Sequence, residues 1–265
     1  MHHVTDPLDP QLDGFRAIRA RESREVLWAE GPTVVERLLR SSHRTRSILA
    51  TPSQHEQLAP LLCNRNVDLF VAERNLIAEV LGFDLHRGVI AIADRPSLVD
   101  LDDTLSTATL IVLLEGVNDA ENLGAIARSA RGLGADALVL DPTCADPWYR
   151  RSVRVSMGEL LHLPVVRSTD WFETLDRITR AGFEIWALTP SVDAIPVHQM
   201  TVPGRPGRLA VMLGAEGPGL PIATLQRTTN VRIPMHHGVD SLNVGHALAA
   251  TLAIVQGSND DDSAE

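Results

Sequence analysis

Three clusters of polar residues and glycines, each directly after an apolar run, hold the side chains of this chain that could do chemistry. In the first cluster, Asn122 stands at the start of an expected helix and Arg128 follows six residues later. Gly124 between them would let a ligand approach the helix N-terminus, where free amides and the helix dipole favour an anion. Taken alone, Asn122 could equally be an ordinary N-cap and Arg128 a solvated arginine.

The second and third clusters lie late in the chain. The second, Gly214–Gly219, has three glycines and a proline after an apolar run, which predicts a loop that exposes its backbone to a nucleotide or cofactor. A tight strand-to-helix turn would use the same residues. The third runs from Pro234 to Asn243, and Ser241 in it is the expected N-cap of a helix reaching Val255. Loops between strands and helices at one sheet edge form the usual ligand crevice of an α/β sheet.

Composition excludes several kinds of chemistry. His236 and His237 do not predict a metal site, because adjacent histidines point apart and no third ligand has matching spacing. The chain has no lysine, which excludes a Walker A loop, a pyridoxal Schiff base and a Ser-x-x-Lys pair. Cys63 and Cys144 are too few for a disulfide framework, so a reducing cytoplasm is expected. We expect no membrane span and no secretory signal.

The net charge of −10 argues against indiscriminate nucleic-acid binding, but it permits local basic patches. The N-terminal third is rich in arginine, and a later group of arginines adjoins Trp148 and Tyr149, which could stack on bases. A solvated helix face is the alternative interpretation of the later group. The arginines predicted to contact RNA are Arg16, Arg19, Arg44, Arg46, Arg150, Arg151 and Arg154.

The pattern of apolar residues predicts two α/β domains that position these clusters. Residues 1–95 are expected to form a small α/β sandwich, 96–107 a polar linker, and 258–265 an acidic disordered tail. In the sandwich we predict strands at 47–50, 67–71 and 88–93, and helices at 14–28, 32–39, 53–62 and 73–81.

Residues 108–257 are predicted to form a mostly parallel sheet covered by helices. The continuous apolar run 110–114 is typical of a strand buried on both faces. The other strands are expected at 137–140, 165–166, 183–188, 209–213 and 231–233, and the helices at 121–133, 150–157, 171–180, 220–226 and 241–255.

The three clusters, in this order, resemble the three sequence motifs of the SpoU/TrmH family of RNA ribose 2′-O-methyltransferases, within the SPOUT superfamily. The resemblance covers residues 110–255, and the N-terminal portion, including residues 83–89, resembles the substrate-binding domain that is appended in this family. The matching residues are Asn122, Gly124 and Arg128 in the first motif, Gly214, Glu216, Gly217 and Gly219 in the second, and Ile233, Pro234, Met235, Ser241, Leu242, Asn243 and Val244 in the third.

This resemblance implies a catalytic domain with a deep C-terminal trefoil knot, S-adenosylmethionine bound in the knot, and a homodimer with the site near its interface. After Val244 the family often continues Ser-Val-Ala, whereas this chain has Gly245, His246 and Ala247. The small residue at 245 should still allow the helix to pack, and His246 is expected to face solvent or a partner subunit. The implied cofactor contacts are Leu188, Thr189, Leu213, Gly214, Gly219, Ile233, Met235 and Leu242.

The implied catalytic residues are Asn122, Arg128, Glu216, Ser241 and Asn243. An arginine side chain has a pKa above about 12 and is a poor base, so we expect Arg128 to hold an RNA phosphate and stabilise the developing alkoxide. The asparagines and Ser241 would position the ribose and the cofactor. Glu216 would orient Arg128 or the glycine loop, or accept the proton through water.

The added N-terminal domain favours ribosomal RNA over transfer RNA as the substrate. Two alternatives remain open at this point. One is a non-catalytic RNA-binding or ribosome-assembly dimer of the same fold. The other is a Rossmann-type nucleotide enzyme, which is disfavoured because the glycine loop comes late and after the wrong elements.

Overall fold

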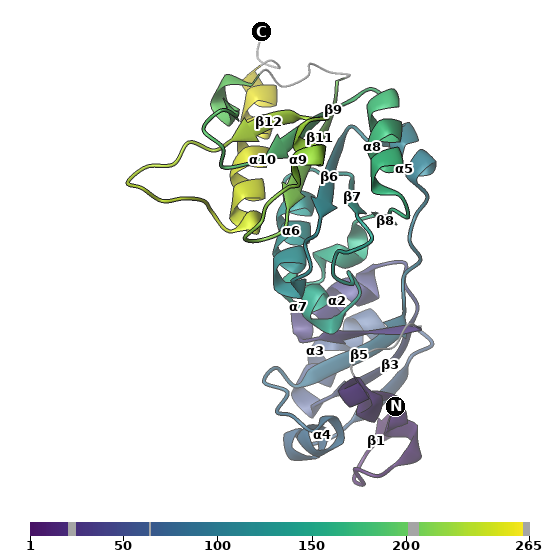
Figure 1. The fold of residues 1–265 in the computed structure, drawn as a ribbon. Coiled ribbons are helices and arrows are strands. Elements are labelled where there is room, and N and C mark those ends of the chain that lie inside the picture. The colour runs from purple at the N-terminus through teal and green to yellow at the C-terminus, as the bar shows by residue number, and fades with distance from the viewer. Residues whose placement is uncertain (21–24, 64, 201–206, 262–265) are drawn as a thin grey trace. The chain divides into compact units, whose positions relative to one another are not determined.

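The computed structural model describes residues 1–20, 25–63, 65–200 and 207–261. The chain divides into two compact units (Figure 1). The N-terminal unit consists of Met1–Ser97 together with Pro147–His162, and the C-terminal unit of Leu98–Asp146 together with Leu163–Glu265. The chain therefore passes between the units three times.

The N-terminal unit is built on a mixed five-stranded sheet in the order β1-β4-β3-β5-β2. Strands β1, β4 and β3 are parallel, whereas β5 runs antiparallel to both β3 and β2. The strands are β1 (His2–His3), β2 (Val26–Glu30), β3 (Thr45–Ala50), β4 (Asp68–Val71) and β5 (Val89–Asp94). The helices are η1 (Pro10–Leu12), α1 (Asp13–Arg16), η2 (Ala17–Ala20), α2 (Pro32–Arg40), α3 (Pro52–Leu62) and α4 (Arg74–Leu81).

The helix predicted over residues 14–28 is wrong. Among the described residues of this stretch, helical structure is found up to Ala20, and Val26–Glu30 form the edge strand β2. The reason is tertiary: Leu27, Trp28 and Ala29 are buried, and the strand pairs with β5, more than fifty residues further along the chain. The short strand β1 also forms within a stretch that shows no strand pattern, because β4 supplies its hydrogen-bonding partner.

The segment Pro147–His162 contains α7 (Arg150–Val155) and η3 (Glu159–His162), and it packs in the N-terminal unit. The Arg37 guanidinium lies 2.8 Å from Glu159 and donates to the Met157 carbonyl at 2.6 Å. His43 Nε2 lies 2.9 Å from the Leu161 carbonyl oxygen. The expected domain boundary at residue 108 therefore assigns this segment to the wrong unit, because its contacts are with residues of the N-terminal unit.

The C-terminal unit has a seven-stranded, fully parallel sheet in the order β10-β12-β9-β11-β6-β7-β8, as the predicted α/β class requires. Its strands are β6 (Leu110–Glu115), β7 (Ala137–Leu140), β8 (Val165–Arg167), β9 (Phe183–Leu188), β10 (Ile195–Pro196), β11 (Arg208–Gly214) and β12 (Thr229–Arg232). Its helices are α5 (Leu101–Thr107), α6 (Ala120–Gly132), α8 (Trp171–Arg180), η4 (Val197–Gln199), α9 (Ile222–Leu225) and α10 (Val244–Asp261). The trefoil knot stays a prediction.

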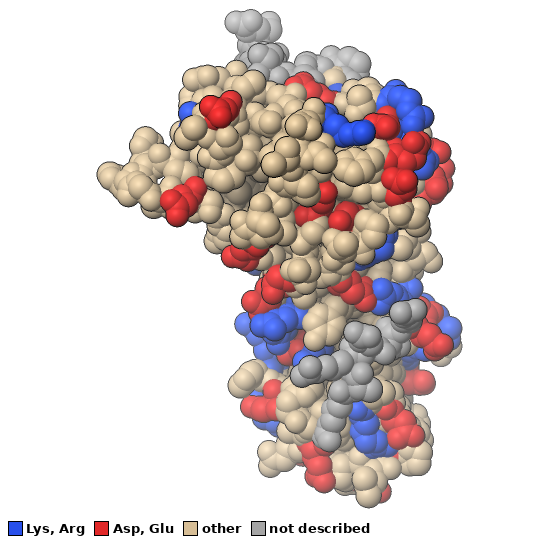
Figure 2. All heavy atoms as spheres, in the orientation of Figure 1, with Lys and Arg blue, Asp and Glu red and all other residues tan. Residues whose placement is uncertain are grey.

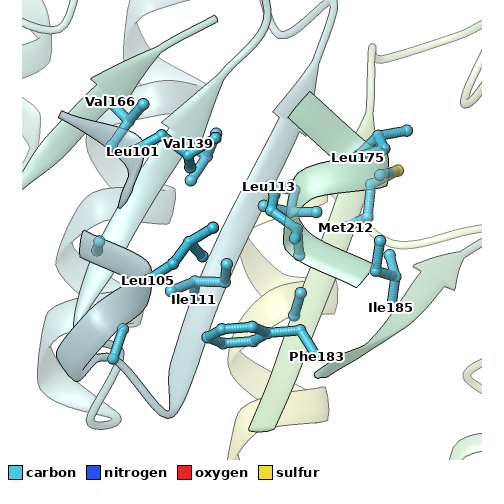
Figure 3. Close-up of a cluster of buried hydrophobic side chains, with 14 of the residues drawn as sticks. Leu101, Leu105, Ile111, Leu113, Val139, Val166, Leu175, Phe183, Ile185 and Met212 are labelled. Carbon is cyan, nitrogen blue, oxygen red and sulfur yellow. The ribbon is translucent and has the colours of Figure 1, made fainter. Parts of the chain in front are cut away.

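The core on one face of this sheet explains why the strands are continuously apolar (Figure 3). Ile111 and Leu113 of β6 are fully buried between neighbouring strands and the covering helices α5 and α8. Burying such a side chain stabilises the fold by roughly 1.5–3 kcal/mol. The cluster also includes Leu101, Leu105, Val139, Val166, Leu175, Phe183, Ile185 and Met212.

Two predicted irregular segments are partly helical. Residues 101–107, which were expected to belong to a linker, form α5, because Asp100 accepts from the Asp102 and Asp103 amides and thereby caps the helix. Leu101 and Leu105, one turn apart, are then buried in the core. The predicted disordered tail begins inside α10, which continues to Asp261, and 262–265 lie outside the described residues. Over the described ranges, no helix is long and apolar enough to cross a bilayer.

Candidate active site

Three of the parallel strands, β6, β11 and β12, end at the same edge of the C-terminal sheet, at Glu115, Gly214 and Arg232. The loop after each strand carries one of the three polar clusters. The loop between β12 and α10 extends away from the sheet (Figure 1). Parallel topology therefore brings together residues that are more than a hundred positions apart in the chain.

Asn122 does not cap α6. Asp119 does, since its carboxylate accepts from the amides of Glu121 at 2.8 Å and Asn122 at 2.9 Å. The Asn122 side chain, only 9% exposed, is thereby left available for other partners. A buried amide of this kind needs both its donor and its acceptor satisfied.

Asn122 supplies the centre of a hydrogen-bonded network that joins all three clusters. Its Nδ2 donates to Glu216 Oε2 at 2.7 Å, and its Oδ1 accepts from Asn243 Nδ2 at 2.8 Å. Asn243 Oδ1 in turn accepts from the Gly245 amide at 3.0 Å. Each amide thus has one defined orientation, which fixes the relative positions of Glu216 and Asn243.

The predicted N-cap at Ser241 is wrong, because α10 begins at Val244 and Asn243 precedes it. Asn243 caps the helix through the Gly245 amide. Gly245 is buried against α6, where an added Cβ would lie 3.2 Å from Ala125 Cβ. A small residue at 245 is therefore needed for the approach of α10 to α6, as expected. His246 is exposed, which agrees with the prediction that it faces solvent or a partner subunit.

Replacing Asn243 by aspartate should separate the two functions of this side chain. Aspartate keeps an oxygen for the Gly245 amide and is a good N-cap, but it leaves the buried Asn122 Oδ1 without its donor, so the free energy of unfolding should fall by about 1–3 kcal/mol. The bond to Asn122 Oδ1 is lost, because two acceptors then face each other. We expect the activity that the three motifs imply to fall at least about tenfold, in protein that is still folded at the assay temperature. Equal activity of Asn243→Asp and wild type would show that the bond to Asn122 does not matter.

The glycine loop folds back on itself between Gly214 and Gly219. The Gly219 amide donates to the Ala215 carbonyl at 3.0 Å, and Gly217 and Gly219 have φ values of +91° and +71°. A Cβ on Gly214 would lie 2.4 Å from the backbone carbon of Gly219. Only glycine fits there, and the loop presents backbone rather than side chains to the adjacent space.

A cavity of about 560 Å³ opens beside this loop. Its walls include Ser241, Asn243 and the two carboxylate residues Glu216 and Asp240, and none of the described residues that line it is cationic. Asp240 and Leu225 were missed by the sequence prediction. All eight predicted cofactor contacts line the cavity, namely Leu188, Thr189, Leu213, Gly214, Gly219, Ile233, Met235 and Leu242.

Arg128 lies outside this network. It is exposed on α6, six residues and roughly 9 Å of helix rise beyond Asn122. It makes no hydrogen bond or ion pair with the part of the chain that the structure describes. Glu216 contacts Asn122 instead of Arg128. The guanidinium is therefore free to bind an external anion.

Most of the predicted RNA-binding arginines make local contacts. Arg16 donates to the Pro7 and Asp9 carbonyls at 2.5 and 2.7 Å, and Arg46 pairs with Asp94. Arg44 lies 3.9 Å from Asp94 and is 76% exposed. The Arg19 side chain lies outside the described residues. Figure 2 accordingly shows basic and acidic side chains interspersed over the N-terminal unit.

Two of the three arginines of α7 share one acidic partner, Glu30 of β2. Arg150 and Arg154 lie 3.6 and 3.5 Å from its carboxylate, and Arg150 also stacks 4.7 Å above the Phe83 ring. Arg151 is exposed. The strip predicted to face RNA is thus partly neutralised, and Arg151 and Arg154 are its more accessible members.

Neither cysteine nor histidine residues form a metal site in the described residues, where no group of three suitable ligands occurs. His236 and His237 are exposed, with ring centroids 6.3 Å apart. Cys144 is buried and its Sγ donates to the Leu114 carbonyl at 3.2 Å.

The two cysteines should differ strongly in reactivity. Burial, together with the neighbouring Asp141, raises the pKa of the Cys144 thiol to about 12. At pH 8 only about one Cys144 in ten thousand would be a thiolate, the reactive form. We expect iodoacetamide to modify the exposed Cys63 and to leave Cys144 unmodified in the folded protein, as read by peptide mass spectrometry. Equal modification at pH 8 without unfolding would contradict this environment for Cys144.

Residues 109–253 match the SpoU rRNA Methylase family. A protein of Mycobacterium tuberculosis, named an uncharacterized tRNA/rRNA methyltransferase, is 40% identical over 261 residues, covering 96% of this chain and 90% of that protein. The 23S rRNA (guanosine(2553)-2′-O)-methyltransferase of Bacillus subtilis is 25% identical over 261 residues, covering 97% of this chain and 100% of that protein.

Solved structures share the whole two-part fold. The crystal structure of an AdoMet-bound rRNA methyltransferase from Sinorhizobium meliloti has a TM-score of 0.80 at 24% identity and covers 97% of each chain. The SpoU methyltransferase AviRb from Streptomyces viridochromogenes has a TM-score of 0.77 at 23% identity, covering 96% of this chain and 99% of that one. At these identities the similarity concerns the fold.

Proposed function

Because this chain belongs to the SpoU rRNA Methylase family, we propose that it methylates a ribose 2′-hydroxyl of ribosomal RNA at the Asn122–Glu216–Asn243 network. Members of this family transfer a methyl group from S-adenosylmethionine to RNA, and this chain is an RNA ribose 2′-O-methyltransferase.

The observation that carries the proposal is the junction of this network with the cavity. Glu216 and Asn243 belong both to the network and to the cavity wall. The cavity suits S-adenosylmethionine, since backbone groups of the glycine loop can hydrogen-bond the nucleoside, apolar side chains can cover the adenine, and carboxylates complement a cationic ligand. Its volume lies in the usual range of about 300–1,000 Å³ for small-molecule sites.

The bound cofactor supplies an electrophilic methyl group on its sulfonium. The residues of this chain must hold the attacking ribose oxygen in line with that methyl and take up the hydroxyl proton as the new carbon–oxygen bond replaces the carbon–sulfur bond. Ser241 and Asn243 line the cavity and can hydrogen-bond the ribose. Glu216 uses Oε2 for Asn122, which leaves Oε1 to accept the proton through a water molecule.

Arg128 is assigned to the RNA phosphate next to the target ribose. Its guanidinium is a poor base but a planar donor that can bind two phosphate oxygens, and its positive charge would stabilise the developing alkoxide. The absence of a competing partner within the described residues supports this assignment.

One relative that matches over both units supports ribosomal RNA as the substrate. The Bacillus subtilis protein, which matches over both units, is named a 23S rRNA methyltransferase. The α/β unit of residues 1–97 with 147–162 is therefore assigned to recognition of rRNA, in the cytoplasm. A homodimer through α6 and α10 is proposed as well, since Arg128, His246 and the 37% exposed Ile254 leave that helix pair partly uncovered.

Tritium transfer from labelled S-adenosylmethionine to separated rRNA and tRNA tests this function. We expect label in rRNA, recovered as 2′-O-methylated nucleotide, and little transfer by Asn243→Asp. Label in tRNA alone would change the substrate. If the cofactor bound but no RNA were labelled, the non-catalytic RNA-binding dimer would be favoured. Mapping ribose methylation in cells with and without the protein would then identify the nucleotide.

A further inference from the structure

A carboxylate at the end of β6 is tied to the far end of the glycine loop. The Thr224 hydroxyl donates to Glu115 at 2.8 Å from Oε2 and 3.2 Å from Oε1. Thr224 is fully buried and Glu115 is partly buried. No cation pairs with Glu115 among the residues that the structure describes. Partly burying a carboxylate without an opposite charge costs free energy, so two apolar side chains in place of Glu115 and Thr224 would make the fold more stable.

The location of this pair connects it to the cofactor cavity. Glu115 is the register partner of Gly214, where the glycine loop begins, and Thr224 lies in α9, directly after that loop. A Cβ on the next residue, Gly116, would lie 3.3 Å from Ala215 Cβ. The end of β6 therefore contacts the loop at its start and holds it again at its end.

What lies between these two points forms one wall of the site. The segment between residues 214 and 225 contributes Glu216, Leu220 and Leu225 to the cavity lining. Leu225 follows Thr224 directly, so a shift of α9 would move the wall. Both ends of a backbone loop must be held if its amides are to stay in place for a ligand.

We propose that Glu115 is a positioning residue which, through Thr224, holds this wall and thereby sets the affinity for S-adenosylmethionine. It does not touch the reacting atoms. The proposal rests on the proposed function only in that S-adenosylmethionine is the ligand of the cavity. It is distinct from the Asn122 network, which meets the same loop at Glu216.

The test compares Thr224→Val, which removes the hydroxyl at nearly constant shape, with Thr224→Ser, which keeps it. For Thr224→Val we expect the Kd and KM for S-adenosylmethionine to rise about tenfold, with kcat at saturation within about twofold. Thr224→Ser should restore affinity to within about twofold of wild type. Glu115→Gln keeps an acceptor oxygen and should lose less affinity than Glu115→Ala. The double variant Glu115→Ala/Thr224→Val should bind no more weakly than the weaker single variant.

Thr174→Val is the matched control for loss of a buried hydroxyl. Thr174 bonds Ser168 at 2.8 Å, and neither residue lines the cavity. It should lower the melting temperature and leave the Kd unchanged. If Thr224→Val and Glu115→Ala likewise lowered only the melting temperature, or lowered kcat with Kd unchanged, the proposal would be overturned. If Thr224→Val did not fold, the comparison of Glu115→Ala with Glu115→Gln would test the proposal instead, again through the Kd for S-adenosylmethionine. Absence of S-adenosylmethionine binding by the wild type would instead refute the proposed function.

Discussion

Replacing Arg128 by alanine should lower kcat for ribose methylation by about 100- to 1,000-fold. The Kd for S-adenosylmethionine should stay within about twofold of wild type, since Arg128 does not line the cofactor cavity. The loss arises because the alkoxide forms without a nearby positive charge and the RNA phosphate is no longer held by a planar pair of donors. Single-turnover methylation with saturating cofactor and RNA measures this effect directly.

Two further variants show what the Arg128 side chain contributes. Arg128→Lys keeps the positive charge but loses the planar pair of donors. Its kcat should therefore be about tenfold higher than that of Arg128→Ala and still below that of wild type. Arg131→Ala removes another exposed arginine of α6 and should leave kcat nearly unchanged. Near-normal methylation by Arg128→Ala, with RNA bound equally well, would show that the assigned role is wrong.

A methyl group added at Gly214 should weaken cofactor binding strongly. The new Cβ would lie 2.4, 2.5 and 2.7 Å from the Gly219 carbon, the Leu220 nitrogen and the Gly219 oxygen. All three are backbone atoms, so no side chain can rotate away and the loop itself must open. We expect the Kd for S-adenosylmethionine to rise at least about 100-fold, equivalent to roughly 2.8 kcal/mol, in a titration of Gly214→Ala.

Alanine at two other glycines separates the steric effect from backbone strain. A Cβ on Gly217 meets nothing within 4 Å, but the residue has a φ of +91°. Gly217→Ala should therefore lower the free energy of unfolding by only about 1 kcal/mol, because the added Cβ strains the backbone at this φ. Gly132→Ala, at the end of α6, also meets nothing, so it should leave cofactor binding unchanged and raise the free energy of unfolding by about 0.4–1 kcal/mol. If Gly214→Ala bound as tightly as Gly217→Ala, the close approach of the loop ends would not limit the site.

The sequence pattern correctly predicted those helices and strands that are determined by the residues within them. The run Leu110–Leu114 is a buried strand, and α8 spans Trp171–Arg180, the range that was predicted for it. The predictions failed where a distant partner decides the structure. Val26–Glu30 is a strand because β5 pairs with it, and Pro147–His162 packs with Arg37 and His43.

The residue types in the three clusters, and their order, were sufficient to identify the family of the chain, and they predicted which side chains carry the site. Only the tertiary structure decided how those side chains are used. Asn122 is free to join Glu216 and Asn243 because Asp119 takes over the cap, and the link between Glu115 and Thr224 has no signature in either stretch. Hydrogen bonds between residues about a hundred positions apart depend on strand order, which the periodicity of a single segment does not encode.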